Sequence, residues 1–262
     1  MNTKVSGCIV TYNEEDIIEE CISSILQHTK NLNFTLYVSD NDSKDKTVEI
    51  IRNKFPEVVL IENKKNGGFG DGHNRVLDQL DSEFHVVINP DIILKENTIE
   101  VLVDYLTLHN DVAMITPKII NEDGSEQYLP KRNPKFSYVI LSKFKPFRNY
   151  RRIYTRQDER ISEPVSVEFC TGCFFVIRTK VMKKMGGFDK RYYMYFEDAD
   201  LSREVRRNGY DIIFYPMVKA VHKWRRENTK SLKGIFRFLT SMVKYFCKWG
   251  GKNGKGTEKK KV

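Results

Sequence analysis

The feature that most constrains the fold is an alternation of short apolar runs with segments of helical periodicity. Five runs are rich in β-branched and other apolar residues: 5–12, 34–39, 58–61, 84–88 and 112–116. Between them, apolar residues recur every three or four positions, as Ile18, Ile22 and Ile25 do. Strands that alternate with helices pair mainly in parallel. The sequence therefore predicts an α/β fold with a mostly parallel central sheet flanked by helices.

The alternation stops near Pro117 and resumes after a long excursion. The basic and aromatic part of this excursion, residues 131–160, carries ten Lys and Arg against two Asp and Glu. Beyond it the pattern predicts strands over 165–178 and 212–215 and helices over 179–185 and 197–208. We expect all of these elements to form one catalytic domain over residues 1–225.

The C-terminal segment is strongly basic. Residues 223–262 carry thirteen Lys and Arg against two Asp and Glu, in a chain of net charge +9. Residues 226–252 combine an apolar helical face with flanking basic side chains, which is typical of a helix on an anionic membrane surface. Packing on the body and a homodimer contact are the alternatives. The apolar positions are Ile235, Phe236, Phe238, Leu239, Met242, Val243, Phe246 and Trp249. Residues 253–262 are rich in Gly and Lys and are expected to be a disordered basic tail.

Several protein classes fit this sequence poorly. No stretch approaches the roughly 20 consecutive apolar residues of a transmembrane helix. The first residues enter a strand-like run directly, without the basic and apolar leader of a signal peptide. The five cysteines are scattered, which does not suit a disulfide framework. These features predict a cytoplasmic protein, peripheral on the inner face of the cell membrane.

Acidic residues stand where predicted strands end. Asp40 follows the second apolar run and Asp91 follows the fourth. Ligands of open α/β sheets bind at the carboxyl ends of the strands. Glu197 and Asp198 open a predicted helix much further along the chain. Carboxylates at these places indicate a site for a nucleotide sugar and a metal, rather than a network of structural salt bridges.

Each motif also has an ordinary structural explanation. Thr11, Tyr12 and Glu14, at the mouth of the first strand, could hold a base or ribose, or simply cap a helix. The glycine-dense segment 66–74 is either a loop that lets a ligand approach the backbone or a flexible turn. A single histidine such as His222 suits a structural role as well as Mn²⁺ or Zn²⁺ ligation.

Taken together, the blocks resemble an inverting family 2 glycosyltransferase of the GT-A (Rossmann-like) fold. The resemblance covers residues 4–225 and rests on the order and spacing of seven motifs. They are I-V-T-Y-N-E-E-D (9–16), S-D-N-D-S-K-D-K-T (39–47), N-G-G-F-G-x-G-x-N (66–74), N-P-D (89–91), G-G-F-D (186–189), F-E-D-A-D-L (196–201) and V-H (221–222). The N-P-D version is similar to the rhamnosyltransferase-type subgroup.

The resemblance implies a role for each matching residue. Asp198 would be the general base, and Glu197 would orient the acceptor. Asp91 would coordinate a divalent cation, Mn²⁺ or Mg²⁺, with His222 as a second ligand. Asn89 replaces the first carboxylate of the usual D-x-D pattern, which leaves a single carboxylate ligand. The residues implied to lie near the nucleotide-sugar donor are Thr11, Tyr12, Glu14, Asp40, Asn66, Gly67, Gly68, Asn74 and Asn89.

The implied reaction moves a sugar from dTDP-rhamnose or a UDP-hexose to a hydroxyl of a glycan or lipid-linked saccharide, in the synthesis of a cell-surface polysaccharide. Two other interpretations stay open at this point. A sugar nucleotidyltransferase of similar fold would carry a G-x-G-T-R-type loop after the first strand, which residues 11–16 lack. A nucleic-acid-binding α/β protein would use the basic aromatic excursion. Nucleic acid is the less favoured partner, because the basic residues are confined to a loop and a tail on an acidic body.

Overall fold

The computed structural model describes residues 3–141, 147–224 and 231–250. Its strands are β1 (Lys4–Thr11), β2 (Asn33–Asp40), β3 (Val59–Glu62), β4 (Phe84–Ile88), β5 (Ile92–Ile93), β6 (Val112–Ile120), β7 (Val165–Ser166), β8 (Phe174–Arg178) and β9 (Asp211–His222). Its helices are α1 (Ile18–Gln27), α2 (Thr47–Lys54), α3 (Phe69–Asn74), α4 (Thr98–Leu108), α5 (Phe136–Leu141), α6 (Arg148–Tyr154), α7 (Thr179–Lys184), α8 (Glu197–Arg207) and α9 (Leu232–Trp249). A short 3₁₀ helix, Leu77–Gln79, follows α3. The predicted mixture of helices and strands is confirmed.

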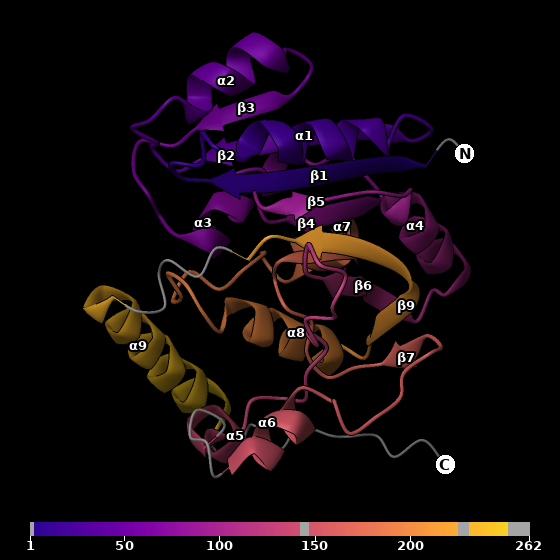
Figure 1. Cartoon of the computed structure of the whole chain (residues 1–262), viewed down its shortest axis with the longest axis vertical. Coiled ribbons are helices and arrows are strands. Elements are labelled where there is room, and N and C mark those ends of the chain that lie inside the picture. Colours follow the sequence, from indigo (N-terminus) through magenta and orange to yellow (C-terminus); the bar gives the residue numbers. More distant parts are fainter. Residues whose placement is uncertain (1–2, 142–146, 225–230, 251–262) are drawn as a thin grey trace.

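All of these strands join one sheet, in the order β3-β2-β1-β4-β8-β6-β9-β5, with β7 paired to β9 (Figure 1). Strands β1 to β4 pair in parallel, as does β6 with β9. Strand β8 enters between β4 and β6 and runs against both, so that Phe174 lies opposite Ile88. Strands β5 and β7 also run against β9. The sheet is therefore parallel on its N-terminal side and mixed beyond β4.

Three predicted elements differ in their bounds. The strand expected over 165–178 is two strands, β7 and β8, because residues 167–173 leave the ladder to form a loop. The helix expected near 70–80 is α3 followed by the separate 3₁₀ turn. The strand expected over 212–215 continues to His222, since β9 pairs along the whole length of β6 and its last residues also pair with β5.

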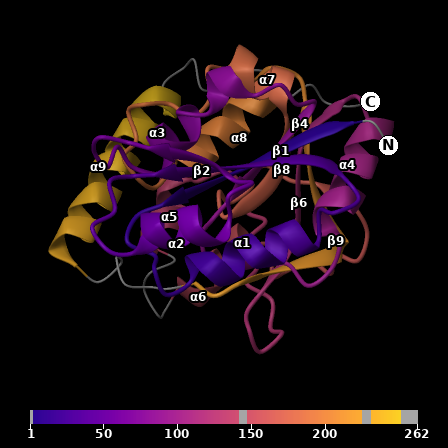
Figure 2. The same ribbon diagram turned by 90° about the horizontal axis from the view of Figure 1, so that it is seen from above.

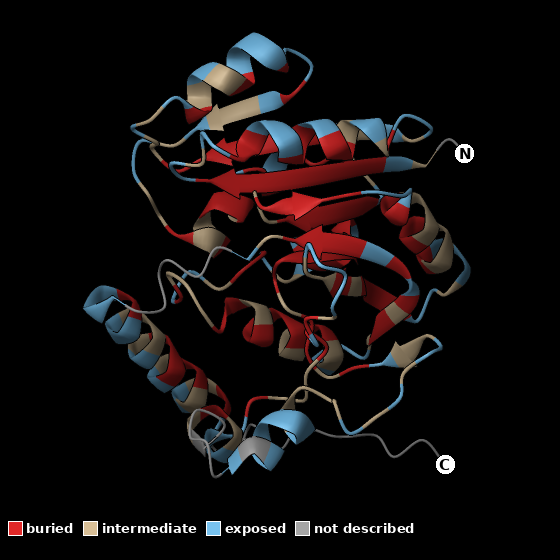
Figure 3. Cartoon of the chain, viewed as in Figure 1, coloured by how far each residue is buried: buried red, intermediate tan, exposed pale blue. Residues whose placement is uncertain are grey.

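Helices cover both faces of the sheet (Figure 2). On one face, the apolar sides of α1, α2 and α4 pack on the strands through residues such as Ile22, Ile51 and Leu102. On the other face, α7 and α8 pack through Met182 and Leu201. Burial of these apolar surfaces is the main stabilising contribution, and it leaves the central strands almost wholly buried (Figure 3).

Helix α9 packs on the body along only part of its apolar surface. Met242, Tyr245 and Trp249 are buried in a third cluster with Phe196 of the loop before α8. The face predicted to be continuous is thus divided into a packed side and an open side. The exposed apolar residues of α9 are Leu232, Ile235, Phe236, Leu239 and Val243. Among the described helices, none combines the length and hydropathy needed to cross a bilayer.

The basic excursion contributes α5 and α6, which contact each other, and α5 packs against α9. The rings of Phe136 and Phe246 meet edge to face, with their centroids 5.8 Å apart. The predicted tail over 253–262 lies outside the described residues, as do 226–230 and 251–252 of the predicted helical segment.

Candidate functional site

Two of the predicted donor residues lie side by side at the ends of β1 and β2. Thr11 pairs with Asp40 in the ladder, and both are buried. The carboxylate of Asp40 accepts hydrogen bonds from the backbone N–H of Ser43 at 2.9 Å and from its hydroxyl at 2.5 Å. The hydroxyl of Thr11 has no partner among the described residues. Next to it, the ring of Tyr12 is exposed, and Glu14 is half-buried.

The glycine-dense segment is fastened to the loop before α8. Asn66 Oδ1 accepts from the backbone N–H of Gly68 at 3.0 Å and from the hydroxyl of Tyr193 at 2.9 Å. Gly68 has φ +91°, and a Cβ there would stand 2.0 Å from the carbonyl oxygen of Tyr193. Only glycine fits this close approach. Gly67 lies beside it, and a Cβ there would meet the side chain of Asp71.

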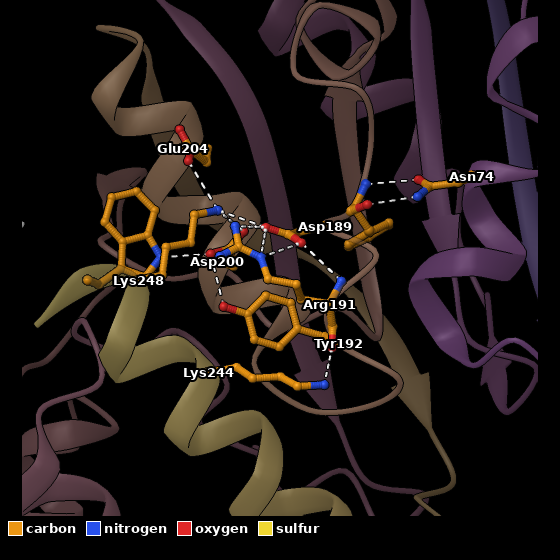
Figure 4. Close-up of polar contacts among 10 residues, drawn as sticks. Asn74, Asp189, Arg191, Tyr192, Asp200, Glu204, Lys244 and Lys248 are labelled. Atoms are coloured by element: carbon orange, nitrogen blue, oxygen red, sulfur yellow. Dashed lines mark hydrogen bonds and ion pairs between the residues drawn. The ribbon is translucent and has the colours of Figure 1, made fainter.

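Asn74 joins the same two segments further along. Its Nδ2 donates to the carbonyl of Phe188 at 2.7 Å, and its Oδ1 accepts from the Phe188 N–H at 2.8 Å (Figure 4). Both polar atoms of the Asn74 amide are therefore hydrogen-bonded to the backbone of the G-G-F-D motif. The structure gives this side chain a clamping role, and its predicted contact with a donor stays a prediction.

Asp91 and His222 meet at the β5–β9 pairing. Gln127 Nε2 donates to the carbonyl of His222 at 2.7 Å and to Asn121 Oδ1 at 2.8 Å, which fixes the orientation of the Gln127 amide. Its Oε1 then accepts from His222 Nδ1 at 2.8 Å. His222 Nε2 faces Asp91 Oδ1 at 3.2 Å.

This arrangement fits a cation. Asp91 Oδ1 is buried without a well-aligned hydrogen bond in the described part of the chain. A carboxylate oxygen and an imidazole nitrogen are both common metal ligands, and the two atoms are close enough to share one ion. A hydrogen bond from the other ring nitrogen to a protein oxygen, such as that to Gln127, is typical of metal-ligating histidine. Asn89 is half-exposed nearby, and its backbone N–H donates to Cys173.

Glu197 and Asp198 form the first turn of α8. Asp198 Oδ2 accepts from the Gly172 N–H at 3.0 Å, whereas Glu197 Oε2 is buried and has no partner among the described residues. Burial raises the pKa of both carboxyl groups, and the charge of Asp198 raises that of Glu197 further. The Gly172 N–H and the ammonium of Lys131 counter the effect of burial on the pKa of Asp198. The pair therefore tends to hold a proton on Glu197 and a charge on Asp198.

The match to a family model decides the class of this protein. Residues 6–186 match the model of glycosyl transferase family 2. The chain belongs to that family. It is 25% identical over 228 residues to an N-acetylglucosaminyl-diphospho-decaprenol L-rhamnosyltransferase of Mycobacterium tuberculosis, covering 81% of this chain and 74% of that protein. It is 24% identical over 252 residues to the rhamnosyltransferase WbbL of Escherichia coli K12, covering 92% of this chain and 91% of WbbL.

Solved structures of glycosyltransferases share the fold. A mannosyltransferase from Pyrobaculum calidifontis, in complex with GDP-Man and Mn²⁺, superposes with a TM-score of 0.67 at 17% identity, over 95% of this chain and 64% of that one. GalNAc-T7 with UDP, GalNAc and Mn²⁺ superposes with a TM-score of 0.71 at 16% identity, over 96% of this chain and 49% of that one. This chain thus spans less than two thirds of either. The predicted GT-A fold is confirmed.

Four residues to which the sequence analysis gave no role contact or face the predicted site residues. Asn41 Nδ2 donates to the Gly68 carbonyl at 3.1 Å, and Gln127 orients His222. Gly172 supplies an N–H to Asp198, and Lys131 lies within its electrostatic range. Asn41 lies within the quoted motif 39–47 and could have been found by its position at a strand end. The other three depend on contacts between segments far apart in the sequence, for which no local signal exists.

The packed side of α9 is tied to the acidic motifs of this glycosyltransferase (Figure 4). Lys248 Nζ lies 2.8 Å from Asp200 Oδ2 and 3.1 Å from Asp189 Oδ2, and Trp249 Nε1 donates to Asp200 Oδ1 at 2.7 Å. Lys244 donates to the carbonyl of Arg191 at 2.6 Å. Two of the basic residues expected to flank a membrane-facing surface therefore point into the protein.

Proposed function

We propose that this chain transfers rhamnose from dTDP-rhamnose to a hydroxyl of a lipid-linked saccharide, with inversion at the anomeric carbon. The observation that carries the proposal is the Glu197–Asp198 pair, in a family 2 chain whose relatives include two rhamnosyltransferases. One of those relatives is named for a diphospho-decaprenol acceptor. A UDP-hexose is the alternative donor, because these contacts do not discriminate between the two bases or between the two sugars.

In this proposal Asp198 takes the proton from the acceptor hydroxyl, and the oxygen attacks the anomeric carbon opposite the leaving diphosphate. A carboxylate whose pKa is raised by burial is a stronger base than an exposed one. Glu197, which keeps its proton, donates a hydrogen bond that orients the acceptor. A single displacement inverts the configuration, so a second nucleophile is not required.

Donor contacts are proposed at the strand ends. Thr11, with its free hydroxyl, and Tyr12, with its exposed ring, would face the nucleoside, together with Asp40 and Glu14. The glycine-dense segment carries Asn66, Gly67 and Gly68, where the backbone can approach a ligand closely.

Asp91 and His222 would hold a divalent cation, Mn²⁺ or Mg²⁺. The described residues hold no cluster of three or more His, Cys, Asp or Glu that could bind a metal, so this pair needs donor oxygens or water as further ligands. When bound, the cation offsets the negative charge that develops on the leaving diphosphate. Asn89 would contact the donor beside it.

The open side of α9 is proposed to lie on an anionic leaflet at the inner face of the cell membrane, which would bring the site to a lipid-linked acceptor. Phe236 and Val243 are 71% and 56% exposed, and Lys233 is exposed on the same helix. Apolar side chains at an interface with adjoining basic ones are typical of interfacial helices. The same open surface would also suit a second copy of the chain.

The proposed reaction is tested by calorimetry and by transfer. Full-length protein is titrated with dTDP-rhamnose and with UDP-sugars, with Mn²⁺ or with chelator, and then given N-acetylglucosamine on a short prenyl diphosphate. Binding of dTDP-rhamnose that chelator weakens, followed by transfer, supports the proposal. Binding of a UDP-sugar alone assigns the other donor. Binding that ignores chelator removes Asp91 and His222 as metal ligands, and failure to bind any donor refutes the proposal.

The membrane contact is tested by flotation with vesicles of phosphatidylcholine and phosphatidylglycerol. The double variant Phe236→Ser/Val243→Ser should lose most vesicle binding while its unfolding transition is unchanged. Leu108→Ser, which removes an equally exposed apolar side chain from α4, is the matched control and should float like wild type. If wild type does not float and its mass doubles with concentration, the surface is a dimer contact instead.

A further inference from the structure

Lys131 carries a half-buried positive charge for which the described residues offer no direct counter-ion. Its ammonium lies 5.2 Å from the centroid of the Phe169 ring and 5.9 Å from that of Tyr154. The ammonium group itself forms no hydrogen bond or salt bridge with any described residue. Aromatic rings compensate only part of the cost of removing such a charge from water. Burial accordingly lowers the pKa of Lys131.

The backbone fixes Lys131 next to the general base. Lys131 and Phe169 exchange two backbone hydrogen bonds, of 3.2 and 3.1 Å. Thr171, two residues further, donates its hydroxyl to the carbonyl of Leu129 at 3.0 Å. The following N–H, that of Gly172, is the donor to Asp198. The segment that carries Lys131 is therefore hydrogen-bonded to the loop before β8, whose Gly172 N–H holds Asp198.

A second cation reinforces this one. Arg151 of α6 acts on Lys131 as a like charge, and among the described residues its guanidinium has no ion-pair partner. Arg151 is exposed, so water solvates its charge, and an anion placed near both cations would be attracted by each of them. Among the described residues, the carboxylate whose charge acts on Lys131 is Asp198, and that charge is consumed when Asp198 accepts the proton of the acceptor. The region is built to hold a further negative charge.

We propose that Lys131, assisted by Arg151, binds the phosphate through which the acceptor saccharide is joined to its carrier. This inference rests on the proposed function and specifies its acceptor: a saccharide carried on a phosphate or diphosphate ester, rather than a neutral glycan end. The acceptor hydroxyl meets Asp198, and its anionic group, one sugar away, meets Lys131. Lysine binds phosphate as a point charge with three donors.

The experiment compares two acceptors that share one sugar: N-acetylglucosamine on a short prenyl diphosphate, and the neutral octyl glycoside. Wild type should show a KM roughly 10- to 100-fold lower for the first, as expected for a hydrogen bond between charged groups. Lys131→Met should remove this difference by raising only the KM for the diphosphate acceptor. Lys131→Arg should restore most of it.

Lys135→Met is the matched control. It removes a lysine of the same excursion that also lies over a ring, that of Tyr138 at 5.4 Å, and it should retain the wild-type preference. An equal loss of rate with both acceptors in Lys131→Met would mean that Lys131 serves the donor or tunes Asp198, and would overturn the inference. So would equal KM values in wild type, a comparison that needs no variant to fold. Absence of transfer to both acceptors overturns the proposed function, and this subsite with it.

Discussion

The strand-end residues and the α8 residues are held in place in different ways. Thr11 and Asp40 are fixed by the parallel ladder of β1 and β2, in which every neighbour is set by register. Asp198 depends on contacts between distant segments. Its carboxylate accepts from the N–H of Gly172, 26 residues away. Asp200, in the same helix, accepts from Trp249, 49 residues away. One part of the site is secured by backbone pairing, and the other by the apolar packing of α8 together with a few long-range polar contacts.

This difference has a physical consequence. A ladder shares its stability over many hydrogen bonds, so a single substitution at its end changes local chemistry more than structure. A region held by a few buried polar contacts loses more when one partner is removed, because the other is left buried and unsatisfied. The strand ends should therefore tolerate substitution of their side chains better than the segments around α8.

The largest effect is expected at Asp198. Asp198→Asn keeps the shape and the hydrogen bond from Gly172 but cannot accept the proton, so transfer should fall by about 10²- to 10⁴-fold. Donor affinity, which we assign to the strand ends, should be unchanged in calorimetry. Asp78→Asn removes an exposed carboxylate and should retain wild-type turnover. Normal turnover by Asp198→Asn would show that another group is the base.

The junction between the two regions should be the next most sensitive point. Gly68→Ala forces a Cβ into the Tyr193 carbonyl at positive φ, so the segment 66–74 must detach from the loop before α8. With φ +91° and ψ −179°, Gly68 lies in a backbone region that is essentially restricted to glycine and costs another residue about 1–3 kcal/mol. Gly124→Ala is the matched control, since Gly124 has φ +84° and nothing within 4 Å of its Cβ position. Chemical denaturation should give a clearly larger loss for Gly68→Ala, with weaker donor binding. Equal losses would mean that the close approach contributes nothing.

The same contrast explains what sequence could predict. Thr11 and Asp40 end strands with apolar β-branched runs, and Asp91 follows another such strand. Because the carboxyl ends of parallel strands meet at one edge, the positions of these residues could be predicted from local pattern. The direction of β8 could not, because it depends on the pairing of Phe174 with Ile88 across a long loop. Nor could the position of Lys131, whose neighbours come from α6 and the loop before β8.

Helix α9 illustrates the limit most clearly. Its periodicity predicted an amphipathic helix and one apolar face, and the helix is present. The side that packs is also bonded to Asp200, whose buried carboxylate accepts hydrogen bonds from the Trp249 N–H and the Lys248 ammonium. A hydrophobicity pattern holds no information about such a partner.

A smaller effect is expected where α9 meets α8. Trp249→Phe keeps an aromatic ring but removes the N–H that Asp200 accepts, so the free energy of unfolding should fall by about 1–3 kcal/mol. Val243→Ser, on the open side of the same helix, should leave it unchanged. Denaturant unfolding measures both. If Trp249→Phe were as stable as wild type, the packed side of α9 would be held by apolar contacts alone, and the contrast with the strand ends would weaken.

The smallest effect concerns two histidines buried beneath the junction. His73 lies between the rings of Phe69 and Phe188, with centroid distances of 4.6 and 5.6 Å, and His85 contacts the hydroxyl of Ser6 at 2.8 Å. Burial lowers the pKa of His73 well below its ordinary value of 6.5, and that of His85 to about 3. Both are neutral in the folded protein, and the unfolded chain binds the protons as pH falls below 6.5.

Stability contributed by these histidines is therefore complete above pH 6.5 and is lost as pH falls. Between pH 6.5 and 5.5, proton uptake by each histidine in the unfolded chain should lower the free energy of unfolding by about 1 kcal/mol. His73→Phe, which retains a ring between Phe69 and Phe188, should remove its share of this pH dependence. Unfolding curves at both pH values decide the matter. If the unfolding free energy of His73→Phe kept the same dependence on pH, His73 would take up its proton in the folded protein. The junction would then open to water, and the strand ends and the α8 region would separate more easily than their contacts indicate.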